Sequence, residues 1–288
     1  TFNAVIYLKD NIATGLFCAS HTSGKLMGQD GPSRRQLLRT ASGAIVGSSL
    51  LYGSTHSARA QSNKSWPQFR YDYTNAGHAS QNSGPVAGID QQWRFETDDV
   101  VNSSPVVVDG TVYIGSDDTN VYALNASDGT EKWRFKTGDW VYSSPAVVDG
   151  TVYIGSFDNS VYALNASDGT EQWRFETNGN VDSSPAVVDG TVYIGSNDNS
   201  IYALNASDST EQWHFETGDY IDSSPVVVDE TVYIGSNDNS VYALNASDGT
   251  EQWRFETRSY VSSGDVNSSP AVVDDTVYIG STNSNVYA

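Results

Sequence analysis

Short hydrophobic runs and polar turns alternate along residues 93–288. The runs are rich in Val, Ile, Tyr, Trp, Phe and Thr, and the turns include Asp109-Gly110, Asp118-Thr119-Asn120 and Ser127-Asp128-Gly129. Such runs, bounded by Gly, Asp and Asn, predict β-strands joined by tight hairpins. None of them has the period of about 3.6 residues that marks an amphipathic helix. The pattern therefore predicts an all-β chain in which four consecutive strands form one antiparallel unit.

The four-strand unit repeats every 40 residues with few changes. The segment Thr111-Val112-Tyr113-Ile114-Gly115-Ser116 returns from Thr151, Thr191 and Thr231, and again from Thr276 after a five-residue insertion. A tandem repeat of this length, built from four antiparallel strands, is typical of propeller blades. We therefore expect a β-propeller of four-stranded antiparallel blades, with about five blades in residues 93–288.

Each unit also carries a motif that resembles a known family. The first copy, Ala123-Leu124-Asn125-Ala126-Ser127-Asp128-Gly129-Thr130-Glu131-Lys132-Trp133, resembles the tryptophan-docking motif of PQQ-like propeller repeats, whose members include BamB-like assembly factors. Further copies span 163–173, 203–213 and 243–253, and Trp66-Pro67-Gln68-Phe69-Arg70 resembles the lead-in segment of that family. The resemblance covers residues 66–288. It implies radial blades, with each tryptophan held between neighbouring blades.

The resemblance also implies structural docking roles for a recurring set of residues. The set is Trp93, Trp133, Trp173, Trp213, Trp253, Ala123, Gly129, Ala163, Gly169, Ala203, Ala243 and Gly249. In the third copy, Ser209 stands where the others have Gly. We expect strain in that turn, because Gly adopts unusual backbone angles at less cost than Ser.

The number of blades in the complete ring has two interpretations. The repeats begin with a lone last strand at Trp93–Thr97 and stop after a third strand at Val286–Ala288. These ends could pair and close a five-bladed ring. Alternatively, the sequence is a fragment of the seven- or eight-bladed rings common in the family. We favour a fragment, because the sequence begins without Met, stops inside a repeat, and as an open arc would expose strand edges.

The charge of the chain excludes several classes of partner. Fifteen Lys and Arg residues face 35 Asp and Glu residues, for a formal net charge of -20. Nucleic acid and anionic membrane surfaces are disfavoured, because both would meet a repulsive field. A strongly acidic surface with few lysines indicates a halophile, of archaeal character; the alternative is an ordinary acidic secreted protein. Cys18 is the single cysteine, so one chain cannot form a disulfide.

The N-terminal region resembles a twin-arginine export signal. Ser33-Arg34-Arg35-Gln36-Leu37-Leu38 is followed by a mild apolar stretch at 41–52 and by Ala58-Arg59-Ala60. A paired arginine, a short apolar core and a small-residue cleavage site suit such a signal, although an arginine pair can arise by chance. The apolar stretch is too short and too rich in Gly and Ser for a stable membrane anchor. We therefore expect a secreted or cell-surface protein without a transmembrane anchor.

These features divide the chain into four segments. Met27 is the only methionine and precedes the arginine pair at the distance expected of a start. We interpret residues 1–26 as a non-native leader, 27–60 as the twin-arginine signal peptide, 61–92 as a lead-in segment and 93–288 as PQQ-like repeats.

Comparison of the copies points to one face of the propeller. The hairpins after the first and third strands barely change, whereas the links between blades and the turn after the second strand differ. Because strands alternate in direction, the two variable elements emerge on the same face. The candidate binding residues there are Trp140, Tyr142, Phe157, Asp182, Tyr220, Asp222 and Tyr260. Aromatic residues on loops of a rigid scaffold suit recognition of a protein or polymer. Drift in unconstrained loops is the alternative.

No residue is assigned a catalytic, cofactor-binding or metal-binding role. PQQ-dependent dehydrogenases share the repeat, but a catalytic Asp should break the repeat, and the Asp residues here recur in every blade. The Asp- and Asn-rich turns lack the Gly and distal Glu of a calcium-binding hand. His214 replaces a recurring Arg and is interpreted as an exposed strand residue. Asn125-Ala126-Ser127 and its copies fit a turn role first and N-glycosylation second.

The sequence therefore predicts an exported, non-enzymatic scaffold that binds a protein or a cell-surface polymer through one loop face, without a cofactor. One alternative is a fragment of a PQQ-dependent quinoprotein dehydrogenase that would use PQQ and calcium. Another is the sensor ectodomain of a larger receptor. The ligand itself cannot be named from the sequence.

Overall fold

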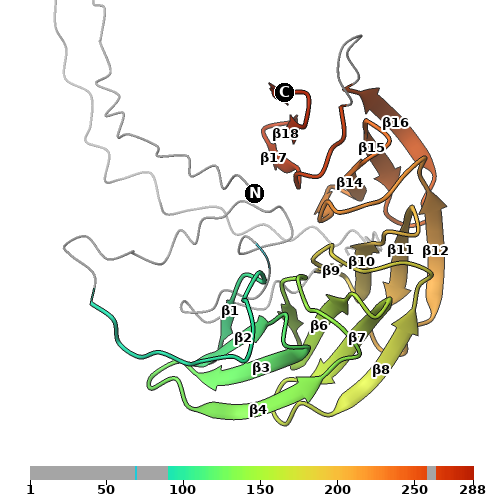
Figure 1. Ribbon diagram of the computed structural model, residues 1–288. Helices are drawn as coiled ribbons and strands as arrows, with labels where there is room; N and C mark the ends of the chain where they lie inside the picture. Colours follow the sequence, from blue (N-terminus) through green and yellow to red (C-terminus); the bar gives the residue numbers. More distant parts are fainter. Residues whose placement is uncertain (1–68, 70–89, 258–263) are drawn as a thin grey trace, which may run out of the picture. The chain divides into compact units, whose positions relative to one another are not determined.

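The computed structural model describes residues 69, 90–257 and 264–288, and its regular structure there consists of β-strands (Figure 1). The chain divides into two compact units, Thr1–Ser57 and Ala58–Ala288, and every described residue belongs to the second. The predicted leader and signal peptide, and most of the lead-in segment, lie outside the described residues. The all-β propeller class expected from the repeat is confirmed.

Each repeat folds into one antiparallel sheet whose strands follow chain order. The first sheet contains β1 (Val106–Val108), β2 (Thr111–Gly115), β3 (Asn120–Asn125) and β4 (Glu131–Lys136), in the order β1-β2-β3-β4. Hairpins join the strands as the turn residues predict. Asp109 adopts a φ of 47° and Gly110 one of 73° in the first turn, which is the left-handed geometry that two-residue hairpins require.

The following three sheets repeat this arrangement. Their strands are β5 (Ala146–Val148), β6 (Thr151–Ser156), β7 (Ser160–Asn165), β8 (Glu171–Glu176), β9 (Ala186–Val188), β10 (Thr191–Gly195), β11 (Ser200–Asn205), β12 (Glu211–Glu216), β13 (Val226–Val228), β14 (Thr231–Ser236), β15 (Ser240–Asn245) and β16 (Glu251–Glu256). The last described sheet has three strands, β17 (Ala271–Val273), β18 (Thr276–Ser281) and β19 (Asn285–Tyr287).

The hydrophobic core lies between successive sheets. The short first strands contact one another in sequence, β1 with β5, β5 with β9, β9 with β13 and β13 with β17. One core cluster joins Tyr113 and Trp133 of the first sheet to Ile154 and Leu164 of the second, and equivalent clusters follow. Strand β7 is buried along nearly its whole length, because neighbouring sheets cover both of its faces. This explains why the middle strands are continuously apolar.

The recurring Ser-Ser-Pro segment links the innermost parts of successive blades. The Ser104 amide donates to the Ser144 hydroxyl at 2.9 Å, and the Ser144 amide donates to the Ser184 hydroxyl at the same distance. The series continues to Ser224 and Ser269. The first serine of each Ser-Ser-Pro segment accepts a hydrogen bond within its own blade. In the second blade, for example, the Gly155 amide donates to Ser143 Oγ at 3.0 Å.

Each tryptophan of the repeat packs against the next blade. Trp133 Nε1 donates to the Ala166 carbonyl at 3.0 Å, and the Tyr113 hydroxyl donates to the same oxygen at 3.1 Å. Trp173 and Trp213 make the same bond to Ala206 and Ala246. Each of these three indoles is only 8% exposed. Ala163, one of the predicted docking residues, lies opposite Trp173 within one sheet, and the alanine that accepts from Trp133 is Ala166, three residues later.

A glycine lies beneath the docked indoles of Trp93, Trp133 and Trp213. Gly169 has a φ of 74°, and a Cβ placed there would lie 2.6 Å from the ring of Trp133. The position thus favours Gly for both backbone geometry and space. Ser209, which replaces this glycine in the third copy, adopts a φ of 61°. A non-Gly residue in this region costs roughly 1 kcal/mol, as the substitution led us to expect.

Two tryptophans differ from the others. The segment at Trp93–Thr97 was expected to be a strand, but it forms none, because no described strand runs beside it; Trp93 Nε1 still donates to the Ala126 carbonyl at 3.0 Å. Trp253 is 40% exposed. Within the described residues its N–H has no acceptor, whereas Trp133, Trp173 and Trp213 each donate to a carbonyl 33 residues later.

This contrast gives a matched stability test. We expect Trp173→Ala to lower the free energy of unfolding by about 3–5 kcal/mol, because it removes a buried indole and one of the two hydrogen bonds to the Ala206 carbonyl, the other coming from the Tyr153 hydroxyl. Trp253→Ala should cost much less, since its indole is exposed and lacks that acceptor. Urea denaturation of both variants at one salt concentration measures the difference. Equal losses would show that packing between blades does not stabilise the fold.

Candidate binding face

The links between blades and the turns after the second strands form one continuous face, here called the link face. It comprises residues 98–102, 138–142, 178–182 and 218–222 with the turns that begin at 117, 157, 197 and 237. In each blade a backbone hydrogen bond joins the two elements: the Phe157 amide donates to the Trp140 carbonyl at 2.8 Å, and the Asn237 amide donates to the Tyr220 carbonyl at 2.9 Å. The predicted placement of both variable elements on one face follows from these bonds.

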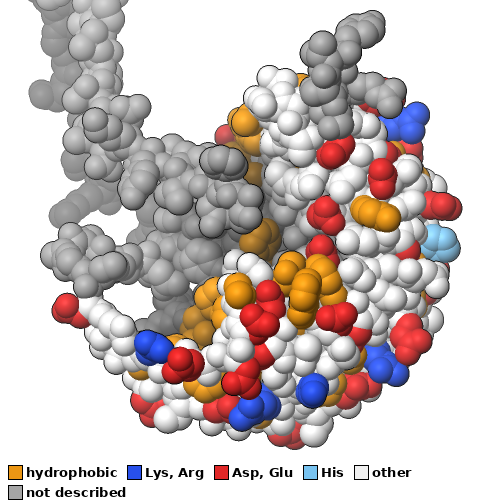
Figure 2. Space-filling model, in the orientation of Figure 1, with side chains coloured by type: hydrophobic (Ala, Val, Ile, Leu, Met, Phe, Trp, Pro, Cys, Tyr) orange, Lys and Arg blue, Asp and Glu red, His pale blue; other side chains and the backbone are white. Residues whose placement is uncertain are grey.

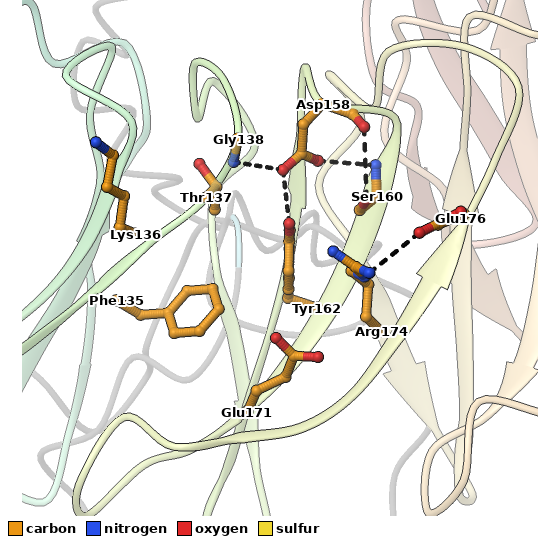
Figure 3. Close-up of a pocket in the computed structure, with 10 residues that line it drawn as sticks. All are labelled: Phe135, Lys136, Thr137, Gly138, Asp158, Ser160, Tyr162, Glu171, Arg174 and Glu176. Atoms are coloured by element: carbon orange, nitrogen blue, oxygen red, sulfur yellow. Dashed lines mark hydrogen bonds and ion pairs between the residues drawn. The ribbon is translucent and has the colours of Figure 1, made fainter.

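A recurring aspartate fixes the start of each link. Asp158 Oδ2 accepts from the Gly138 amide and from the Tyr162 hydroxyl, both at 2.6 Å, while Oδ1 accepts from the Ser160 amide at 3.0 Å (Figure 3). Burial, followed by the bond to Asp158, raises the pKa of Tyr162 to about 12. The aspartate thus ties the incoming link to the turn and the third strand of the next blade.

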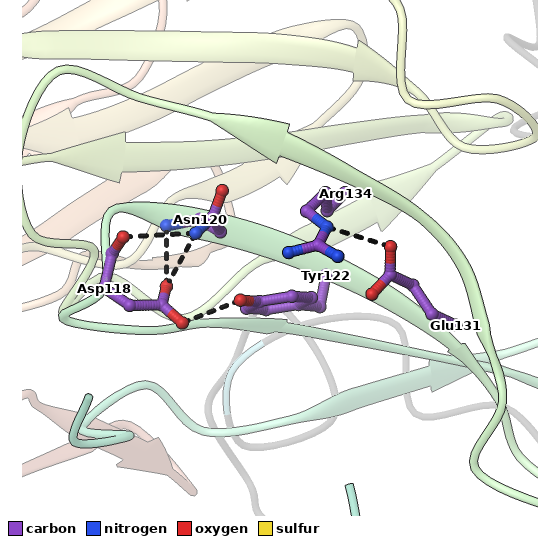
Figure 4. Close-up of polar contacts among 5 residues, drawn as sticks. All are labelled: Asp118, Asn120, Tyr122, Glu131 and Arg134. Carbon is purple, nitrogen blue, oxygen red and sulfur yellow. Dashed lines mark hydrogen bonds and ion pairs between the residues drawn. The ribbon is translucent and has the colours of Figure 1, made fainter. Parts of the chain in front are cut away.

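In the first blade the equivalent aspartate is Asp118. Asp118 binds Tyr122 at 2.7 Å and Asn120 at 3.0 Å, and Arg134 lies over the Tyr122 ring while it pairs with Glu131 (Figure 4). Burial acts to raise the pKa of Asp118, but the hydrogen bonds from Tyr122 and Asn120 outweigh it, so the pKa is lowered. The carboxylate is therefore held ionised at neutral pH, as an acceptor of several donors should be.

The variable side chains of the link face meet in pairs. The last residue of each link faces the first residue of the turn: Asn102 Nδ2 donates to Asp117 Oδ2 at 2.9 Å, and Asn237 Nδ2 donates to Asp222 Oδ2 at 3.0 Å. The second blade has Tyr142 and Phe157 at the same two positions, with ring centroids 4.5 Å apart. The two variable positions of the repeat are thus neighbours, and each pair is either polar or aromatic.

Trp140 completes an aromatic cluster in the second blade. Its ring stacks on Tyr142 at 5.8 Å between centroids and 8° between planes, and it lies 5.7 Å from Phe157. The indole remains 44% exposed, and Tyr220, at the same repeat position two blades later, is 53% exposed. The structure therefore brings Trp140, Tyr142 and Phe157 together. Tyr220 instead adjoins the Asp222–Asn237 pair.

Asp182 and Asp222 lie in successive links and influence each other. Burial, reinforced by the charge of Asp222, raises the pKa of Asp182 to about 7, although a hydrogen bond with Asn197 acts in the opposite direction. Asp182 Oδ1 and Asn197 Oδ1 have no protein partner. The pair is a locally destabilising feature when both carboxylates are ionised.

Tyr260 lies outside the described residues, so its predicted place on the face is not described. The register of the last link is given by a described contact. The Thr282 amide donates to the Asp265 carbonyl at 3.0 Å, which makes Asp265 the equivalent of Trp140 and Tyr220. The five-residue insertion therefore displaces Tyr260 from the repeat position. Comparison of the copies with the insertion removed could have found this.

A shallow pocket opens between the first two blades beside the link face (Figure 3). Its lining includes charged and aromatic side chains, mostly from β4, β7 and β8. The lining residues are Phe135, Lys136, Thr137, Gly138, Asp158, Ser160, Tyr162, Glu171, Arg174 and Glu176. Arg174 pairs with Glu176 at 3.1 Å. Among the described residues, no group of three His, Cys, Asp or Glu side chains could hold a metal ion. That the chain uses no cofactor stays an untested prediction.

Known proteins share this repeat and this fold. The family model described as outer membrane protein assembly factor BamB matches residues 83–181 and 158–288, which together span more than half of the chain. The chain belongs to the BamB family. No curated protein matches this chain. No helix of its described residues is long and apolar enough to span a membrane.

Solved structures resemble this BamB-family chain at low identity. BamB from Moraxella catarrhalis has a TM-score of 0.59 and 19% identity, and the match covers 67% of this chain and 61% of that one. Quinohemoprotein alcohol dehydrogenases from Comamonas testosteroni (TM-score 0.66, 18% identity) and Pseudomonas putida HK5 (0.62, 20%) match over 76% and 78% of this chain and 46% of their own length. The chain thus spans about half to three-fifths of these relatives, which share its fold.

The Asp182–Asp222 pair predicts an unusual pH dependence of stability. The pKa of Asp182 is about 7 in the folded protein and near 3.8 when unfolded, so the folded state binds more protons between these values. Stability should therefore fall as the pH rises from about 4 to 7. Asp182→Asn removes this titration, and its advantage over the parent should grow from pH 5 to pH 8.

Denaturation midpoints at fixed salt measure this effect. Asp208→Asn is the control, because Asp208 is exposed and hydrogen bonds from Thr210 lower its pKa, so it does not titrate in this range. A constant difference between Asp182→Asn and the parent from pH 5 to pH 8 would rule out a protonated Asp182.

Proposed function

We propose that this chain is an exported, non-enzymatic scaffold that binds a partner protein or a surface polymer through its link face. The observation that carries the proposal is the aromatic cluster of Trp140, Tyr142 and Phe157. Tyr142 and Phe157 occupy positions that hold polar pairs in the other complete blades, and Trp140 stacks on Tyr142. The same backbone hydrogen bond joins link and turn in all four of these blades. Exposed aromatic residues on rigid loops are the usual anchors of protein interfaces.

The rigidity of the loops supports this role. The Gly138 amide binds Asp158, the Thr137 hydroxyl donates to the Asp139 carbonyl at 2.6 Å, and the Trp140 amide donates to Asp139 Oδ1 at 2.8 Å. The link around Tyr220 contains the same three bonds, made by Gly218, Thr217 and Asp219. A loop that is ordered before binding loses little conformational entropy on binding, which favours affinity.

Family membership supports a protein partner. The family is named for an outer membrane protein assembly factor, and one similar solved structure is a BamB. A quinoprotein oxidoreductase is the second candidate, because two similar structures are quinohemoprotein alcohol dehydrogenases. At 18–20% identity, their similarity to this chain is one of fold alone. A sensor ectodomain is a third interpretation, and no observation on the described residues favours it.

Site-specific photo-crosslinking tests the proposal. Benzoylphenylalanine in place of Tyr220 reports from the link face, and the same residue in place of Ser167 reports from the opposite face. We expect crosslinks to a defined protein or polymer from position 220 alone, when the protein is exported in its native cell. The identified partner, once purified, should bind Trp140→Ala about tenfold or more weakly than the parent.

Two results would contradict this function. Equal crosslinking from both positions would show that the link face is not the binding surface. Reduction of a dye by the purified protein with PQQ and calcium, at a rate that depends on an alcohol substrate, would instead establish quinoprotein chemistry.

Export by the twin-arginine route is a separate part of the proposal. It depends on Arg34 and Arg35 ahead of a short apolar stretch. Replacement of both by Lys should retain the protein inside the cell, as measured by fractionation and immunoblotting. The matched control is Arg59→Lys, which keeps the arginine pair. Undiminished export of the double variant would exclude this route.

A further inference from the structure

The aromatic cluster of the second blade is set in a negative field. Asp99, Asp117 and Asp182, in the links and turns of the link face, act on Tyr142, and Asp139 accepts a hydrogen bond from the Trp140 amide at 2.8 Å. Burial, and then the charges of Asp117 and Asp182, raise the pKa of Tyr142 above its ordinary value. Burial raises the pKa of a phenol whatever the sign of the potential, so the contribution of the neighbouring carboxylates is the part of this shift that reflects negative charge around Tyr142.

Cationic side chains are segregated from this cluster. The described Lys, Arg and His residues lie on β4, β8, β12 and β16, apart from Arg94, which precedes β1. The described links at 98–102, 138–142, 178–182 and 218–222 contain none. In the face shown in Figure 2, acidic side chains adjoin hydrophobic ones, whereas the blue and pale blue groups lie toward the outer margin. The link face therefore offers aromatic rings and carboxylates without an internal cation to neutralise them.

This combination selects a class of ligand. The face of an indole attracts a cation, and Arg stacks on Trp more often than Lys does. Nearby carboxylates steer and retain the same cation. A neutral polymer gains nothing from the field, and an anionic one is repelled.

Resting on the proposed function, we infer that the link face binds a partner protein segment bearing Arg or Lys, whose cationic side chain lies against the exposed Trp140 indole. Tyr142 and Phe157 hold the indole in place, since the Trp140 and Tyr142 rings are nearly parallel and Phe157 contacts both. Tyr220 lacks such support, because Asp222 and Asn237 occupy the equivalent positions. The second blade is thus the centre of the contact.

A peptide panel tests this inference with the full chain. The probe is a fluorescent, acetylated Gly-Ser peptide with three Arg residues, and its matched forms carry citrulline or Glu at the same places; a neutral β-glucan oligomer represents a polymer ligand. Binding is followed by anisotropy at two salt concentrations, at both of which circular dichroism shows the native fold. We expect the Arg peptide to bind about tenfold more tightly than the citrulline peptide, and less tightly at the higher salt concentration.

Variants assign the contact to the second blade. Trp140→Ala should weaken binding of the Arg peptide about tenfold, and Trp140→Phe by less, because Phe attracts cations more weakly than Trp. Asp99→Asn should weaken it a fewfold. The control is Asp168→Asn, which removes one charge from the opposite, fixed-hairpin face and should leave binding unchanged.

The outcomes separate this inference from the proposed function. One outcome is that the Arg and citrulline peptides bind equally, or that the glucan binds more tightly than either, and that Trp140→Ala weakens this binding. This would refute the cationic ligand but keep the link face as a binding surface. A second outcome is that Asp99→Asn and Asp168→Asn weaken peptide binding equally and Trp140→Ala does not weaken it. The peptide would then be attracted only by the overall acidity of the protein, and the inference would be wrong. Crosslinking of a partner at position 220 without any peptide binding would likewise refute the inference alone.

Discussion

The docking of each tryptophan on the next blade is the interaction on which the described structure depends. A single four-stranded sheet has two apolar faces and cannot bury them alone. Trp133, together with Tyr113, covers the face of the following sheet and satisfies one carbonyl there, that of Ala166. Because each blade forms its hydrophobic core with the next blade, every interface between two blades adds to the stability of the fold.

This constraint explains which parts of the repeat stay constant. The hairpin after the third strand carries the acceptor alanine and the glycine beneath the indole, and it binds the hairpin after the first strand, as where the Ala166 amide donates to the Gly150 carbonyl at 2.9 Å. A change there would disturb the neighbouring blade as well as its own. The link face, in contrast, is held by backbone bonds and by a recurring aspartate. Its other side chains can therefore change without loss of the frame.

The repeat length, strand pattern and turn residues were enough to predict the blades, because each depends on local sequence alone. Other features depend on contacts between distant residues. The facing of Tyr142 and Phe157 arises only when the link folds back over the turn, and the choice of Ala166 over Ala163 as acceptor depends on how two sheets pack. The unpaired state of Trp93–Thr97 likewise depends on the strands around it, because none of the described strands runs beside it.

The paired positions of the link face show how one scaffold can hold different chemistry in each blade. At the same two positions the second blade has an aromatic pair, whereas the third has Asp182 with Asn197 and the fourth has Asp222 with Asn237. The acidic pairs have an energetic cost, since Asp182 and Asp222 repel each other when ionised, and the repeat alone does not require them. The first blade shows that an amide can replace the acid at this position: Asn102 is there, and its partner Asp117 binds it. Each of the three polar pairs therefore keeps one carboxylate, and these carboxylates add negative charge to the link face that carries the aromatic cluster.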